Sequence, residues 1–137
     1  MKSFLDSNVL VYLFDQDAPG KKATAQQILQ TEGTVGNLVI STQVLQEFYV
    51  TVTRKLAQPL KADTALEAVD RFVTLPLVVV DAALILSAIR RSHKDSISFW
   101  DSLIIDAALK AGAQRLWSED LQDGRVVNGM RIENPFR

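Results

Sequence analysis

The chain alternates between short apolar runs and longer segments in which apolar residues recur every three or four positions. The short runs predict buried strands, and the longer segments predict amphipathic helices. The expected strands are Lys2–Leu5, Asn37–Ile40, Leu77–Val80, Arg115–Trp117 and Arg131–Glu133. The expected helices are Asn8–Phe14, Lys21–Gln30, a segment capped by Ser41 or Thr42 that runs to about Ala57, Ala62–Thr74, Ala82–Arg91 and Phe99–Ala111. Pro19-Gly20 predicts a turn over Asp17–Lys22.

Strands and helices alternate along almost the whole chain. This order is typical of a parallel sheet that is covered by helices on both faces and joined by right-handed crossovers. The length of 137 residues suits one domain with a core and is too short for two ordinary ones. We therefore predict a single α/β domain over residues 1–137. In such sheets, ligands bind beyond the carboxyl ends of the strands.

Three acidic residues fall at that predicted edge of the sheet. Asp6 directly follows the first strand, and Asp120 follows a later one. Glu47 lies in the first two turns of the helix that comes after the second strand. Asp101 begins its own helix without a clear strand before it, so the topology does not place it. The positions predict that at least three carboxylates share one rim.

Each acid also has an ordinary structural interpretation. Asp6 could cap the short helix after it, and Asp101 could form a capping box with Ser98. Glu47 could be a solvated helix residue, and Asp120 could belong to a turn. Only their coincidence at one rim favours a functional site over four separate structural roles.

Clustered carboxylates repel one another, and a cation relieves that repulsion. The chain has no cysteine and one histidine, His93, which we expect on the surface at a helix end. Ligation by oxygen alone suits Mg²⁺ or Mn²⁺ better than Zn²⁺. Such an ion activates water and stabilises charge on phosphate oxygens, so the pattern indicates phosphodiester hydrolysis. Asp106 is rotated away from Asp101 on the same helix, and we expect it to be exposed or locally paired.

The charge balance limits how nucleic acid could bind. The net charge is −1, so a basic surface must come from local grouping. Arg54 is the candidate for RNA binding, with Lys55 beside it, because Arg54 lies in line with Glu47 on its helix. Arg54 could instead pair only with Glu47 or with solvent. No apolar run predicts a transmembrane helix, no cleavage site suggests a signal peptide, and a cytoplasmic location is expected.

Five sequence blocks, in order, resemble the motifs of the PIN-domain family. They are FLDSNVLVY, QEFYVTVTRK, FWDSLIIDAALKAG, LWSEDLQDG and RIENPF. The match spans nearly the whole chain. The short, single-domain form is similar to the VapC-type toxins of bacterial toxin–antitoxin pairs.

The resemblance implies a PIN-like three-layer α/β/α fold with a central, mainly parallel five-stranded sheet. It implies a pocket that binds Mg²⁺ or Mn²⁺, endonucleolytic cleavage of RNA, and inhibition by an antitoxin peptide laid across that pocket. It also implies a homodimer, which could assemble with the antitoxin into a hetero-oligomer. The family's acids correspond to Asp6, Glu47, Asp101 and Asp120, with Asp123 as an additional acid. The family's polar positions around these acids correspond to Ser7, Asn8 and Ser118.

Two alternatives stay open on the sequence. A PIN nuclease could process RNA or DNA without an antitoxin. A catalytically silent PIN-like module could bind RNA or a protein. Loss of two or more of the four acids would favour the silent module, and none is lost.

Overall fold

The computed structural model describes residues 1–137 and contains six strands and six helices. The strands are β1 (Ser3–Leu5), β2 (Leu38–Ser41), β3 (Leu77–Val78), β4 (Arg115–Trp117), β5 (Val126–Val127) and β6 (Met130–Glu133). The helices are α1 (Ser7–Tyr12), α2 (Pro19–Gly33), α3 (Thr42–Arg54), α4 (Ala62–Phe72), α5 (Ala82–Asp95) and α6 (Phe99–Lys110).

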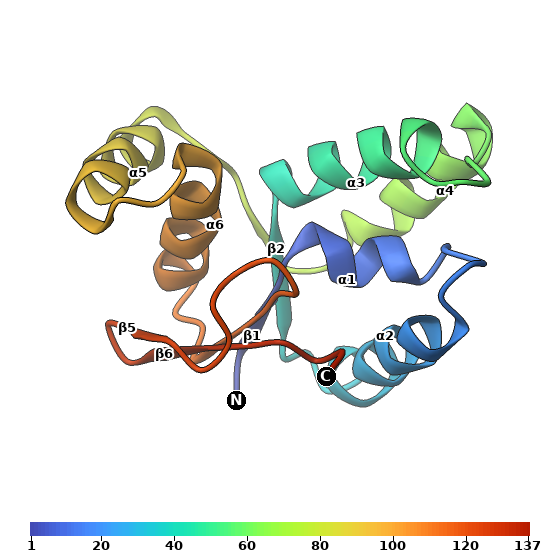
Figure 1. Ribbon diagram of the computed structural model, residues 1–137, viewed down its shortest axis with the longest axis horizontal. Coiled ribbons are helices and arrows are strands. Elements are labelled where there is room, and N and C mark those ends of the chain that lie inside the picture. The colour runs from blue at the N-terminus through green and yellow to red at the C-terminus, as the bar shows by residue number, and fades with distance from the viewer.

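The strands form one sheet in the order β3-β2-β1-β4-β6-β5. Five strands run parallel, and only β5 is antiparallel to its neighbour. In Figure 1, helices α5 and α6 lie on one side of the central strands, and α1 to α4 lie on the other. The predicted α/β fold with a mainly parallel central sheet is therefore confirmed.

The sheet has one strand more than expected, because β5 was missed. Strands β5 and β6 form a hairpin in which Val127 pairs with Met130. Its turn consists of Asn128 and Gly129, which both have positive φ, 48° and 84°. An Asn-Gly pair between apolar residues favours this tight turn, so the sequence did carry the signal.

Most element boundaries differ from the prediction by a few residues, and three of these differences have a local cause. Pro19 and Gly20 belong to α2 and not to a turn, because proline is well suited to the first position of a helix. Helix α5 runs on to Asp95 and stops where Ser96 adopts a left-handed conformation, φ 53°. Strand β3 ends at Val78, because its one partner strand, β2, ends at Ser41, which pairs with Val78.

The core lies around the two central strands. Phe4, Leu5, Ile40 and Leu116 are fully buried, and Phe48 of α3 packs into the same core. Burial of these side chains on both faces of the sheet stabilises the fold and fixes where β1 and β4 end. No helix is both long enough and apolar enough to span a bilayer.

Asp106 is buried, so the expectation of an exposed residue is wrong and that of a paired one is confirmed. It is 5% exposed. The Arg91 guanidinium donates to its carboxylate at 2.6 Å, and the Ser87 hydroxyl donates at 3.0 Å. These bonds join α5 to α6 and compensate the desolvated charge. His93 is exposed near the end of α5, as expected.

Candidate active site

Asp6 occupies the carboxyl end of the central strand. Leu5 pairs with Trp117 in the parallel β1–β4 ladder, so the next residues of the two strands, Asp6 and Ser118, lie side by side. The Ser118 hydroxyl donates to Asp6 Oδ2, and the Ser7 N–H donates to Asp6 Oδ1, both at 2.7 Å. Asp6 is also the N-cap of α1. The predicted capping role and a role in the acidic rim are therefore both compatible with its position.

The environment of Asp6 favours its protonated form. Burial, opposed in part by the hydrogen bonds from Ser118 and Ser7, raises the pKa of Asp6 from 3.8 to about 7. The charges of Glu47 and Asp120 make smaller contributions to this rise in the pKa. Asp6 therefore lies near two other carboxylates, as the topology predicted.

Glu47 reaches the same place from α3. Strand β2 ends at Ser41, whose hydroxyl caps α3, and the helix then carries Glu47 towards α1. The Ser7 hydroxyl donates to Glu47 Oε1 at 3.2 Å. Ser7 thus links Asp6 and Glu47, since its N–H binds one and its hydroxyl binds the other.

Asp120 is held by the turn that follows β4. The Ser118 hydroxyl accepts the N–H groups of Asp120 and Leu121, which folds this turn back over the strand end. The Asn8 side chain donates to Asp120 Oδ2 at 3.2 Å and accepts the Glu119 N–H at 3.3 Å. Asn8 therefore ties α1 to the Asp120 turn. The three expected polar positions, Ser7, Asn8 and Ser118, all contact the acids.

Asp101 stands apart from these direct contacts. The Ser98 hydroxyl caps α6 by accepting the Asp101 N–H at 3.0 Å, which is one of the two hydrogen bonds of the capping box that was the structural alternative for Asp101. The Asp101 carboxylate itself takes part in no hydrogen bond or ion pair within the chain. The first turn of α6 is nevertheless fixed to α3, because the Gln43 amide donates to the Trp100 carbonyl at 3.2 Å.

Gln43 is a site residue that the sequence analysis missed. Its side chain is 2% exposed, and its Nε2 donates both to Glu47 Oε2 and to the Trp100 carbonyl, each at 3.2 Å. The reversed amide would set an oxygen against two acceptors, which fixes the orientation. Gln43 thus positions Glu47 and the start of the Asp101 helix together. The only sequence feature that links Gln43 to the site is its position four residues, or one helical turn, before Glu47.

Asp123 is engaged elsewhere. Its two carboxylate oxygens accept the Asn134 N–H at 2.7 Å and the Arg137 guanidinium at 2.6 Å. Asp123 thus closes the C-terminal segment over the turn after β4. The structure gives it no contact with Asp6, Glu47 or Asp120.

The acidic residues suit a hard cation by their chemistry. The donors at this rim are carboxylate oxygens with neighbouring hydroxyl and amide groups, and neither thiolate nor imidazole is present, which suits Mg²⁺ or Mn²⁺. In the conformation described, no three acidic or histidine side chains converge closely enough to hold one ion together. Glu47 and Asp120 are turned towards their hydrogen-bond donors instead.

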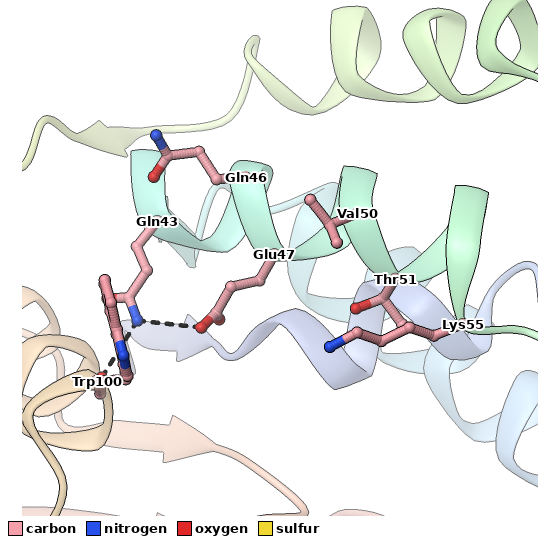
Figure 2. Close-up of a pocket in the computed structure, with 7 residues that line it drawn as sticks. All are labelled: Gln43, Gln46, Glu47, Val50, Thr51, Lys55 and Trp100. Carbon is pink, nitrogen blue, oxygen red and sulfur yellow. Dashed lines mark hydrogen bonds between the residues drawn. The ribbon is translucent and has the colours of Figure 1, made fainter.

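A pocket of about 390 Å³ opens beside Glu47 (Figure 2). It is lined by Gln43, Gln46, Glu47, Val50, Thr51, Lys55 and Trp100. Lys55 lines it and Arg54 does not, although Arg54 was the candidate for RNA binding. Arg54 is exposed and forms no ion pair with Glu47 or with any other acid. Of the two basic residues at the end of α3, only Lys55 borders the pocket.

The chain belongs to the PIN domain family, whose model matches residues 3–126. No curated protein sequence matches it. Among solved structures, it is similar to VapC20 of Mycobacterium tuberculosis, a sarcin-ricin loop cleaving toxin, with a TM-score of 0.65, 19% identity, and coverage of 87% of this chain and 90% of that one. The chain is also similar to a toxin–antitoxin complex from Klebsiella pneumoniae, with a TM-score of 0.69, 16% identity, and coverage of 98% of both chains. For DNA-bound VapBC from Salmonella typhimurium, the TM-score is 0.67, the identity is 18%, and the coverage is 98% of both chains. At these identities the similarity concerns the fold.

Proposed function

We propose that the protein is a metal-dependent endoribonuclease of the VapC toxin type. The observation that carries the proposal is the grouping of Asp6, Glu47 and Asp120 at the carboxyl ends of β1, β2 and β4 in a PIN domain. Asp101 would complete the acidic set from the first turn of α6. The residues that would hold Mg²⁺ or Mn²⁺ are these four. We leave Asp123 out, because both of its oxygens bind the C-terminal segment.

The chain's own groups prepare this rim for phosphodiester hydrolysis. A bound Mg²⁺ or Mn²⁺ would supply an activated water and neutralise charge that develops on the phosphate. Asp6 is held rigidly by two hydrogen bonds, so its carboxylate is oriented before substrate arrives. Its burial, which makes the uncompensated charge costly, also gives it a strong preference for a cationic partner. Ser7 and Gln43 hold Glu47 in the same way.

The partner proposal rests on the fold neighbours. Complexes from Klebsiella pneumoniae and Salmonella typhimurium pair a chain of this fold with an antitoxin or form a VapBC assembly. We propose that this chain is likewise neutralised by a cognate VapB-like antitoxin and that it forms a homodimer or a toxin–antitoxin hetero-oligomer. Induced expression should arrest growth, and coexpression of the correct antitoxin should relieve the arrest.

The direct test is cleavage of single-stranded RNA by purified protein with Mg²⁺, with Mn²⁺ or with a chelator. Wild type should cut only with metal. Asp6→Asn removes one charge while conserving size, and turnover should fall roughly a hundredfold or more. Asp70→Asn is the matched control, because Asp70 is exposed on α4 and forms no ion pair.

Three outcomes would overturn the proposal. Cleavage by Asp6→Asn at the wild-type rate would show that the acidic rim is structural. A wild type that binds RNA but never cuts it with either metal would favour the silent module. Equal cleavage of DNA and no growth arrest would favour a PIN nuclease without an antitoxin.

A further inference from the structure

The pocket beside Glu47 contains side chains that are not needed to position this acid. Its walls come from two elements, α3 and the first turn of α6. Figure 2 shows the Trp100 side chain on one side, next to Gln43, and the Lys55 side chain at the far end of α3. Glu47 lies between them, so the pocket is continuous with the acidic rim.

Trp100 is the most exposed aromatic residue of the protein, at 62%. A lone exposed aromatic is common and needs no explanation. Here, however, the ring borders a pocket, and its helix turn is anchored to α3 through the hydrogen bond between Gln43 and the Trp100 carbonyl. Edge contact with Phe99, at 5.1 Å between ring centroids, further orients the indole. The ring is thus presented on a fixed support.

The other end of the pocket is cationic and unpaired. Lys55 is exposed and forms no ion pair or side-chain hydrogen bond within the chain. Thr51 and Gln46, which lie between, also have side chains without hydrogen-bond partners in the chain. Lys55 follows Glu47 by eight residues, which is about 12 Å along a helix axis. This is a separation of backbone positions, and the Lys55 side chain points back from there towards Glu47 in Figure 2, so its ammonium group faces the part of the pocket next to the acids.

We propose that this pocket is a subsite for an unpaired nucleotide next to the scissile phosphate, in which a base stacks on Trp100 and Lys55 binds a backbone phosphate. Aromatic platforms combined with a basic group are how proteins hold single-stranded nucleic acid. The polar Thr51 and Gln46 are free to bond a base or a ribose. The inference rests on the proposed ribonuclease function and adds that the substrate must be unpaired at the cleavage site.

An RNA is favoured over an apolar peptide as the occupant because five of the seven lining residues are polar or charged and Lys55 offers an unpaired cation. The neighbouring groove between α3 and α4 has the opposite character, since its lining includes Leu45, Tyr49, Leu66 and Val69. Tyr49 is an exposed aromatic residue of α3 that lies outside the proposed subsite. It therefore serves as the control for Trp100, and the neighbouring Arg54, which does not line the pocket, serves as the comparison for Lys55.

The test measures the affinity for a fluorescently labelled single-stranded RNA octamer. Binding is detected by fluorescence anisotropy in the presence of a chelator, which prevents cleavage. Trp100→Ala should weaken binding about tenfold or more, Trp100→Tyr should restore most of it, and Tyr49→Ala should have no effect. Lys55→Ala should lower the slope of the salt dependence by about one counterion, and by more than Arg54→Ala does, because only Lys55 borders the pocket. Thermal melting would confirm that each variant is folded.

A set of octamers with a single abasic position supplies the second measurement. At one position of the octamer, loss of the base should weaken binding to wild type. The same loss should not weaken binding to Trp100→Ala any further. Wild-type affinity in both Trp100→Ala and Lys55→Ala would overturn the inference. So would a variant pair that binds RNA normally but loses its antitoxin, since the pocket would then be a protein site. RNA cleavage is measured separately. If the wild type does not cut RNA at all, the ribonuclease proposal is refuted, but the binding subsite is not.

Discussion

Replacement of Asp6 by asparagine should make the stability of the metal-free protein less sensitive to pH. The pKa of Asp6 is about 7 in the folded protein and 3.8 ordinarily. Because the folded-state pKa is raised, the folded protein binds the proton more tightly than the unfolded chain does. The cost of Asp6 is therefore absent below pH 3.8, grows as the pH rises, and is complete above the folded-state pKa.

The magnitude follows from the size of the shift. At about 1.4 kcal/mol per pKa unit, the cost is about 2 kcal/mol at pH 5 and about 4 kcal/mol at pH 8. The asparagine that replaces Asp6 would carry no charge but would lose one of the two hydrogen bonds that Asp6 accepts, at about 1–2 kcal/mol at either pH. The free energy of unfolding of Asp6→Asn should therefore rise by about 2–3 kcal/mol relative to wild type between pH 5 and pH 8.

Urea unfolding with a chelator at several pH values measures this difference, and Asp70→Asn is the control. The Asp70 carboxylate is exposed, so its removal should shift both ends of the pH curve equally. Parallel curves for wild type and Asp6→Asn would refute the reasoning. They would mean that burial does not hinder ionisation of Asp6.

Three further outcomes are expected. Mn²⁺ should raise the melting temperature of wild type at pH 8, less so in Asp101→Asn, and less at pH 6, where protonation of Asp6 competes with the metal; no shift at pH 8 would contradict the metal site. Gln43→Met should change the free energy of unfolding by no more than about 1 kcal/mol, since it also removes a buried, unpaired oxygen, yet lower RNA cleavage about tenfold; unchanged turnover would show that Gln43 does not position the acids. Arg91→Ala should cost about 3–5 kcal/mol in urea unfolding by leaving a buried charge, against about 0.5 kcal/mol for exposed Arg90→Ala, and equal losses would contradict that account.

Much of the fold could be predicted because apolar runs and amphipathic periods mark its elements directly. The parallel sheet followed from their alternation. The misses have local causes. Val126–Val127 is too short to be recognised as a strand from its apolar residues. Only the Asn128-Gly129 turn predicts the hairpin to which it belongs. Pro19 was interpreted as part of a turn, although proline also begins helices.

The candidate site was predictable where the sheet's topology alone places a residue. Asp6 and Asp120 follow strands, and Glu47 follows the helix start, so one edge collects them. Gln43 could not be found in this way, because its contact with the Trp100 carbonyl joins residues 57 positions apart and depends on how α6 packs. Arg54 and Lys55 differ by one residue and therefore point in different directions from α3, and helix spacing alone did not show that Lys55 borders the pocket.

The central position of β1 has a consequence for protein synthesis. The hydroxyl that orients Asp6 belongs to Ser118, which is synthesised 112 residues later. A growing chain that has reached Lys110 already contains Asp6, Glu47 and Asp101, yet it lacks β4, the second neighbour of β1. The acidic rim should thus stay incomplete on the ribosome until translation has passed Ser118. A fragment of residues 1–113 should neither cut RNA nor arrest growth; arrest by that fragment would show that the first half of the sheet suffices.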